Sequence, residues 1–186
     1  MADIIKDGTG TGYLAKVDDK NRLNTRAVTE TENKFINSED EESFLYYSDI
    51  TPTGAGDIFC YIKNTSTKDL IINWYRVWSG TTAEAIDIYT GMTGTPTTTT
   101  TIVPHNMNVT SANTATGLFY ESVDMGGLSG GTLMDRIRLA GDGKDVIDSY
   151  PGDIIIKTGG VMTLQALTGA IALEVTLSFY YNTTGG

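Results

Sequence analysis

The sequence contains few of the residues on which catalysis and metal binding usually depend. Its 186 residues include one histidine, His105, and one cysteine, Cys60. A single histidine excludes a histidine-dependent catalytic triad and a multi-histidine metal site within one chain. A single cysteine excludes an intramolecular disulfide and is typical of reducing cytosol, although an intermolecular bridge stays open. We expect His105 at a turn or strand end and Cys60 buried inside a strand.

Basic residues and long apolar runs are scarce as well. The chain has 13 basic against 23 acidic residues, a net charge of −10, and no cluster of lysine and arginine. Binding to a nucleic-acid backbone needs such clusters, so nucleic acid is excluded as the main partner. No stretch approaches the roughly 18 apolar residues of a membrane span. Because Met1–Lys6 also lacks the basic and apolar regions of a secretory signal, we expect a soluble protein without a membrane partner.

Residues that favour strands and turns are abundant. The chain has 21 glycines and ten tyrosines but four prolines, and threonine is common. Aromatic and β-branched side chains fit a pleated surface better than a helix. A chain of this length forms one domain of ordinary size, which buries roughly 70% of the surface that the unfolded chain exposes. The composition therefore predicts a single all-β domain.

The C-terminal segment shows the clearest periodicity. From residue 171 to residue 181, apolar side chains occupy every second position, and smaller or polar residues lie between them. The apolar set is Ile171, Leu173, Val175, Leu177, Phe179 and Tyr181. A period of two places these side chains on one face of a strand, whereas a helix would scatter them. The pattern predicts a long strand with one buried face.

Shorter strands separated by turn-rich breaks precede this segment. Residues 57–63 and 70–78 flank the turn sequence Asn64–Asp69, and we predict that they form a β-hairpin. Further strands are expected at 85–89, 118–123, 133–139 and 153–157, and a threonine loop at 97–101 leads into a strand at 102–103. Glycine-rich stretches at 90–96, 126–131 and 141–143 are interpreted as a linker and as breaks between strands. Together these patterns predict an antiparallel β-sandwich at 43–186, for which a jelly roll is one candidate topology.

Carboxylates are the remaining route to catalysis, because glycoside hydrolysis needs two of them and little else. Glu121 and Asp124 flank one predicted strand, and Asp135 lies in another. Their spacing does not distinguish a catalytic pair from surface charges. Three aspartates within 142–148 offer oxygens for calcium, but Lys144 lies among them and the spacing departs from an EF-hand loop. We interpret 142–148 as a turn and predict no catalytic residue, no metal site and no cofactor.

Aromatic residues in the predicted strand 70–78 form a candidate binding surface. Trp74 and Trp78 occupy positions of the same parity, so they face the same side of the strand. Together with Tyr75 they offer a platform on which a sugar stacks. The same arrangement is typical of a core or of a subunit interface. We favour the core or the interface and keep the sugar platform as the alternative.

The first 42 residues differ in character from the rest. Three glycines alternate at positions 8, 10 and 12, and the apolar residues that follow are too few to close a core, so ordering this segment costs conformational entropy. We predict an extended N-terminal arm at 1–42 that orders on a partner surface. Its candidate partner-binding residues are Tyr13, Leu14, Val17, Leu23 and Val28. The acidic run Glu39–Glu42 is interpreted as a solvated loop, with contact to a basic patch on a partner as the alternative.

The arm also carries a family resemblance. Ile5–Leu23 followed by Ala27–Glu30 resembles the N-terminal segment shared by many tailed-bacteriophage virion proteins, with a DGTG turn, an AKV strand, an NRL turn and a VTE exit. Residues 61–72 and 150–156 are similar in style to the β-sandwich bodies of those proteins. The resemblance implies a non-enzymatic structural component of a phage particle and supplies no catalytic residue.

The resemblance further implies a capsid decoration protein. Its expected partners are the major capsid protein or other virion proteins, and a homotrimer is expected by analogy. Such a protein is assembled in the bacterial host cytoplasm and lies on the capsid surface. Two alternatives stay open, a head-tail adaptor or tail component and a receptor- or carbohydrate-binding module.

Overall fold

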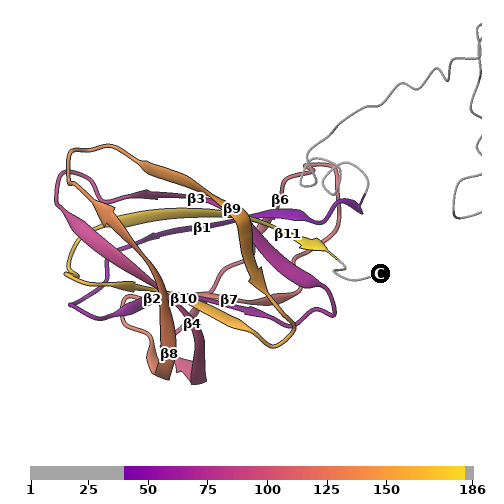
Figure 1. Cartoon of the computed structure of the whole chain (residues 1–186), viewed down its shortest axis with the longest axis horizontal. Helices are drawn as coiled ribbons and strands as arrows, with labels where there is room; N and C mark the ends of the chain where they lie inside the picture. Colours follow the sequence, from indigo (N-terminus) through magenta and orange to yellow (C-terminus); the bar gives the residue numbers. More distant parts are fainter. Residues whose placement is uncertain (1–39, 183–186) are drawn as a thin grey trace, which may run out of the picture. The chain divides into compact units, whose positions relative to one another are not determined.

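Two antiparallel sheets pack face to face (Figure 1). The computed structural model describes residues 40–182, except for the side chains of 148–153. The five-stranded sheet has the order β6-β1-β11-β3-β9 and consists of β1 (Ser43–Ile50), β3 (Asp69–Trp78), β6 (His105–Asn106), β9 (Val146–Ile156) and β11 (Leu173–Asn182). The six-stranded sheet has the order β5-β7-β2-β10-β4-β8 and consists of β2 (Ile58–Asn64), β4 (Glu84–Thr97), β5 (Thr100–Thr101), β7 (Gly117–Glu121), β8 (Gly126–Leu139) and β10 (Val161–Ala166). Within the described residues no helix is long and apolar enough to cross a membrane.

The pairing of the eight main strands is that of a jelly roll. β1 pairs with β11, β2 with β10, β3 with β9 and β4 with β8, all antiparallel. These nested pairs correspond to one long hairpin with the β4–β8 ribbon at its tip. The hairpin is folded over, so that successive pairs of strands alternate between the two sheets. The short strands β5, β6 and β7 lie between β4 and β8 in the chain. The expected all-β antiparallel sandwich is confirmed, and its topology is the jelly roll.

The predicted C-terminal strand is confirmed as β11. Its alternating side chains from Leu173 to Tyr181 are each at most 4% exposed and belong to the core between the sheets. Ile171 precedes the strand and is half-buried. The rings of Phe44, Phe119 and Phe179 stack in this core, with centroid distances of 5.6 Å and 5.2 Å to Phe179. The period-two pattern predicted the strand because one face of it is buried against another layer.

The predicted hairpin of 57–63 and 70–78 is wrong. β2 lies between β7 and β10 in one sheet, whereas β3 lies between β11 and β9 in the other. The turn Asn64–Asp69 therefore crosses from one layer to the opposite layer. Local sequence predicts a turn between two strands, but which sheet each strand joins depends on its distant partners.

Two glycine-rich stretches interpreted as a linker and a break are also corrected. Residues 90–96 belong to β4 and residues 126–131 to β8, and the two pair with each other. A Cβ on Gly94 would lie 2.1 Å from the carbonyl oxygen of Gly127, and a Cβ on Gly127 would lie 2.2 Å from that of Thr95. Glycine is required here because the two backbones approach too closely for a side chain. These stretches have the glycine-rich composition of loops, and for this reason the sequence predicted a linker and a break instead of paired strands.

The β4–β8 ribbon covers part of the outer face of the six-stranded sheet. Met92 and Met125 form a second apolar cluster with Ile58 and Tyr61, separate from the main core. Thr163 lies opposite Tyr61 in the sheet register and donates a hydrogen bond to Met92 Sδ at 3.3 Å. The ribbon therefore buries apolar side chains on a sheet face that would otherwise meet solvent.

The threonine segment is extended only in part. β4 continues to Thr97, and Thr100–Thr101 form β5. The predicted strand at 102–103 is absent, although Ile102 N donates to the carbonyl of Phe119 at 2.9 Å. The strands predicted at 85–89, 118–123, 133–139 and 153–157 correspond to parts of β4, β7, β8 and β9.

Candidate functional site

β1 begins where β11 ends, at one end of the sandwich (Figure 1). A polar pocket is lined by residues from this end. Its volume is about 590 Å³. We call it the end pocket, and its lining residues are Glu42, Phe44, Thr65–Lys68, Ala112–Thr114, Thr116 and Tyr181. They come from the start of β1, the β2–β3 turn, the segment before β7 and the end of β11. The jelly roll brings these four segments to one end.

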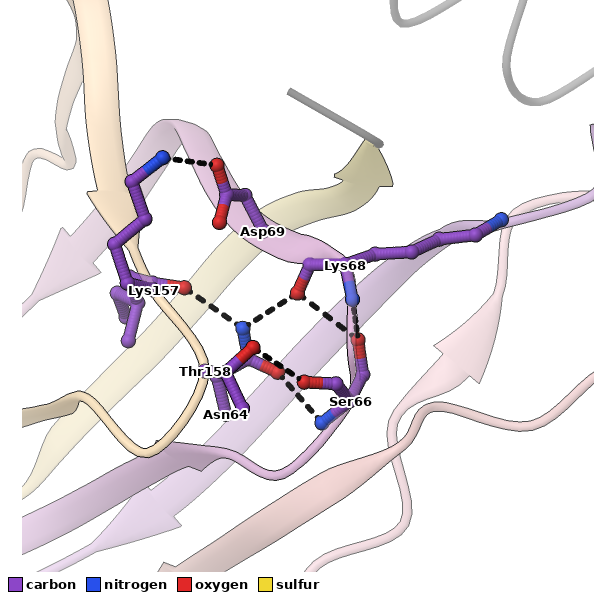
Figure 2. A network of polar contacts seen from close by, with 7 residues as sticks. Asn64, Ser66, Lys68, Asp69, Lys157 and Thr158 are labelled. Atoms are coloured by element: carbon purple, nitrogen blue, oxygen red, sulfur yellow. Dashed lines mark hydrogen bonds and ion pairs between the residues drawn. The ribbon is translucent and has the colours of Figure 1, made fainter. Parts of the chain in front are cut away.

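One wall of the end pocket is the β2–β3 turn, which Asn64 holds in shape (Figure 2). The Asn64 side chain is buried, and its Nδ2 donates to the carbonyls of Lys68 and Ile156, both at 2.8 Å. Its Oδ1 accepts from Ser66 N at 2.9 Å. Thr158 Oγ1 donates to the carbonyl of Ser66 at 2.8 Å. These bonds tie the turn both to itself and to the opposite sheet, so the wall is rigid.

Two ion pairs flank this turn. Lys68 Nζ lies 2.6 Å from Glu42 Oε2, which joins the β2–β3 turn to the residue before β1. Lys157 Nζ lies 2.5 Å from Asp69 Oδ2, whose side chain is 9% exposed (Figure 2). The first pair balances the charge of the two ionic side chains that line the end pocket. The pocket therefore offers hydrogen-bonding groups without a strong charge of either sign.

Glu42, which also lines the end pocket, belongs to the segment through which the chain enters the sandwich. The carbonyls of Asp40–Glu42 accept, in order, from Asn113 Nδ2 at 3.3 Å, Asn106 Nδ2 at 2.7 Å and Tyr181 N at 3.1 Å. Glu41 adopts a φ of 56°, a left-handed conformation that is uncommon outside glycine. We call Asp40–Glu42 the arm base. Three donors from three different segments fix its path.

Aromatic side chains contribute the apolar part of the end pocket. Phe44 and Tyr181 pack edge to face with their centroids 5.8 Å apart. Tyr181 Oη donates to the carbonyl of Thr116 at 2.8 Å, and burial raises the pKa of this phenol. Hydroxyl, amide and peptide groups surround this pair. Such a lining is suited to an extended peptide, whose backbone needs hydrogen bonds and whose side chains need apolar contacts.

The structure does not bring the three candidate carboxylates together. Glu121 lies at the end of β7 and accepts from Ser48 Oγ at 2.6 Å. Asp135 lies on β8, four strand spacings from β7, which is about 19 Å. Asp124 is exposed in the turn after β7. Among the residues that the structure describes, no group of three histidine, cysteine, aspartate or glutamate side chains could hold a metal ion.

The remaining candidate residues have separate positions. Cys60 is fully buried in the core, and burial raises the pKa of its thiol to about 12. His105 is exposed in the short strand β6, opposite Leu45. The turn after β8 holds Asp142 with Lys144 Nζ at 3.1 Å, and this ammonium keeps the pKa of that carboxyl below its ordinary value.

The two tryptophans share a face, but not that of the core. Tyr75 and Val77 belong to the core, whereas Trp74 and Trp78 occupy the alternate positions on either side of this pair and are half-buried on the outer face of the five-stranded sheet. Trp78 Nε1 donates to the carbonyl of Gly143 at 3.2 Å. The expected placement in the core is therefore wrong for both tryptophans, and the interface alternative stays a prediction.

The five predicted partner-binding residues, Tyr13, Leu14, Val17, Leu23 and Val28, lie outside the described residues. The sequence reasoning missed the end pocket and the arm base. Asn64, Asn106 and Asn113 were visible as turn-type residues, but their partners are distant in sequence. Comparison of the chain with protein-family models, with curated proteins and with solved structures finds no match.

Proposed function

We propose that this chain is a non-enzymatic structural component of a bacteriophage particle, a capsid decoration protein. In this proposal the N-terminal arm binds the major capsid protein or another virion protein through Tyr13, Leu14, Val17, Leu23 and Val28. The sandwich stays on the capsid surface as a rigid body. Copies assemble in the host cytoplasm as a homo-oligomer, with three copies expected, and neither nucleic acid nor a membrane takes part.

The observation that carries the proposal is the arm base. Three hydrogen bonds and the Glu42–Lys68 ion pair hold the point where the chain enters the sandwich. An arm anchors a domain only if its base is fixed, because otherwise a pull on the arm would unravel the first strand instead of holding the domain. The 39 preceding residues span at most about 140 Å when fully extended. That length allows contacts well beyond the edge of the domain.

The fold supports the same proposal by analogy. Jelly rolls recur in viral capsid domains as well as in lectins and cupins. Fold alone does not assign function, so the analogy is secondary to the arm base.

Deletion of residues 2–30 tests the anchor. We expect the shortened protein to keep its thermal transition and to be lost from purified particles assembled from a genome that carries the deletion. Leu14→Asp and Val17→Asp in the full chain should weaken incorporation, because a charge replaces an apolar anchor. Thr11→Asp is the matched control with the same added charge, and it should incorporate more fully. Normal incorporation of the deletion variant would overturn the anchor role.

The location of the protein in the particle separates the proposal from its nearest alternative. Density of a particle reconstruction should contain the sandwich repeatedly on the outer capsid surface. Density confined to the neck or the tail would instead identify a head-tail adaptor or tail component. Saturable binding of the purified protein to cell-surface glycans would favour a receptor-binding module.

A further inference from the structure

The outer face of the five-stranded sheet carries a row of side chains at matched register. Tyr47 on β1 lies opposite Thr176 on β11, Thr176 opposite Arg76 on β3, and Arg76 opposite Ile147 on β9. Their chain neighbours Tyr46, Val175, Leu177, Tyr75 and Val77 belong to the core. The row therefore points away from the core and runs across four strands. Trp78 and Glu174 lie opposite each other in the next row. We call Tyr47, Arg76, Trp78, Ile147, Glu174 and Thr176 the outer patch.

The outer patch is unusually apolar for the outer face of a sandwich, where polar residues are the rule. Tyr47 is 44% exposed and Ile147 is 66% exposed. Trp74 and Trp78 are half-buried on the same face. Aromatic residues and arginine are enriched in protein interfaces, and lysine is depleted. The outward positions of β1, β3 and β11 contain no lysine, and their aromatic residues and Arg76 are of the enriched types, whereas Glu174 and Asp49 are of depleted types.

The charges of the outer patch are paired within the face. Arg76 Nη2 lies 4.0 Å from Glu174 Oε2, and the two side chains are 41% and 36% exposed. At this distance the guanidinium keeps most of its donors for another acceptor. Burial together with the carboxylates of Glu174 and Asp49 raises the pKa of Tyr47, whereas Arg76 lowers it, which places these side chains in one electrostatic cluster.

This face carries Arg76 beside Glu174, with Asp49 opposite Glu174 in the register, so another copy of the face offers an acceptor to Arg76 and a donor to Glu174. When two such faces meet, each Arg76 lies against a Glu174 of the neighbouring copy while apolar side chains close around the pair. A partner of uniform charge would meet one like charge on this face. The chain as a whole has a net charge of −10, so copies repel each other over most surfaces. On this face Arg76 offsets part of the negative charge of Glu174 and Asp49.

We infer that a second copy of this chain packs on the outer patch, with Arg76 of one copy against Glu174 of the next. The inference rests on the homo-oligomer of the proposed function and identifies the surface that forms it. It is independent of the arm, because the patch belongs to the sandwich. Because the outer patch meets its own copy, the interface is isologous and joins copies in pairs. The mass of the assembly should therefore show an even number of copies in place of the three expected from the resemblance, and a closed trimer would overturn this surface.

Charge reversal with mixing tests the inference on the full chain. In Arg76→Glu both charged residues of the patch are negative, and in Glu174→Arg both are positive, while Asp49 next to the patch is unchanged in both variants. We expect each variant alone to dissociate, with a dissociation constant raised at least about tenfold, because like charges then face each other. An equimolar mixture of the two variants should restore the wild-type mass in sedimentation or light scattering. Failure of the mixture to associate would overturn the pairing of Arg76 with Glu174.

Ile147→Asp tests the apolar part of the outer patch. It should lower the mass of the assembly, whereas Val109→Asp, at a side chain that is 92% exposed and outside the patch, should leave it unchanged. Thermal transitions near that of the wild type show that both variants are folded. If Ile147→Asp and both charge variants keep the wild-type mass, the outer patch is not the interface, although the protein is still a homo-oligomer. A monomeric wild-type protein would overturn both the interface and the homo-oligomer. The anchor role of the arm is tested separately, by incorporation of the deletion variant into particles.

Discussion

Asp87 of β4 and Arg136 of β8 form a two-point ion pair. Arg136 Nε donates to Asp87 Oδ1 at 2.5 Å, and Nη2 donates to Oδ2 at 2.8 Å. The Asp87 side chain is 2% exposed, whereas that of Arg136 is 38% exposed. The pair therefore fastens the edge strand β8 to β4, and its two members differ in how much solvent reaches them.

This difference predicts unequal effects of the two truncations. Arg136→Ala leaves the buried carboxylate of Asp87 without a cation, whereas Asp87→Ala leaves a guanidinium that water can solvate. Arg136→Ala should therefore lower the free energy of unfolding more than Asp87→Ala. The double variant should be more stable than Arg136→Ala alone, because it removes the unpaired charge. Urea unfolding of the three variants measures the order, and equal effects of both single variants would contradict it.

Asn64 should be essential for the β2–β3 turn. Asn64→Ala removes the donors to the carbonyls of Lys68 and Ile156 and the acceptor for Ser66 N, and the Lys68 carbonyl keeps only the bond from Ser66 Oγ at 3.0 Å. We therefore expect a loss of about 2–4 kcal/mol in unfolding free energy. Asn64→Asp keeps the acceptor for Ser66 N but loses both donors, and it should also destabilise. Thr65→Ala, at an exposed position in the same turn, is the matched control and should stay within about 0.5 kcal/mol of the wild type.

Substitution of two glycines in the β4–β8 ribbon allows the cost of backbone strain to be measured apart from the cost of a steric clash. Gly91 has a φ of +72°, and a Cβ at this position would meet nothing within 4 Å, so Gly91→Ala should cost only the left-handed conformation, about 1–2 kcal/mol. Gly127 has a φ of +79°, and its Cβ would lie 2.2 Å from the carbonyl oxygen of Thr95. Gly127→Ala should therefore cost a further 1–3 kcal/mol, roughly, from overpacking. Thermal unfolding of both variants measures the difference, and equal losses would show that the ribbon relaxes.

Stability should fall at alkaline pH because of Cys60. Burial raises the pKa of this thiol from 9.0 to about 12, so the unfolded chain loses its proton first. The unfolding free energy is then unaffected below about pH 8 and decreases as the pH rises toward 12, at up to about 1.4 kcal/mol per pH unit. Burial also raises the pKa of Tyr46, which adds to the decline above about pH 10.

Cys60→Ala isolates the thiol contribution. In this variant the decline between about pH 9 and 10 should be shallower than in the wild type, as measured by urea unfolding at each pH. A thiol reagent should react with native Cys60 only at the rate of unfolding, since the side chain is 0% exposed. Rapid reaction of the native protein near neutral pH would contradict the burial argument.

The sequence correctly predicted those strands and turns that are specified by short stretches of residues. The alternation from residue 171 to residue 181 specifies β11, because the buried face of a strand requires apolar side chains at every second position. The turn predicted at Asn64–Asp69 is confirmed, because β2 ends at Asn64 and β3 begins at Asp69. The pairing partners of these two strands are distant in sequence, and for this reason their assignment to one hairpin failed. The end pocket was missed for the same reason.

Four features were predictable without the structure: the all-β class, the buried strand β11, the burial of Cys60 and the lack of histidine or cysteine pairs within one chain. Each of these follows from composition or from a period of two. Four other features became known from the folded chain alone: the jelly-roll pairing, the glycine ribbon of β4 and β8, the hydrogen bonds to Asp40–Glu42 and the outward position of Trp74 and Trp78. The physical reason is that these features depend on contacts between residues far apart in the chain, where a turn, a glycine or a tryptophan has the same local sequence whichever surface it meets.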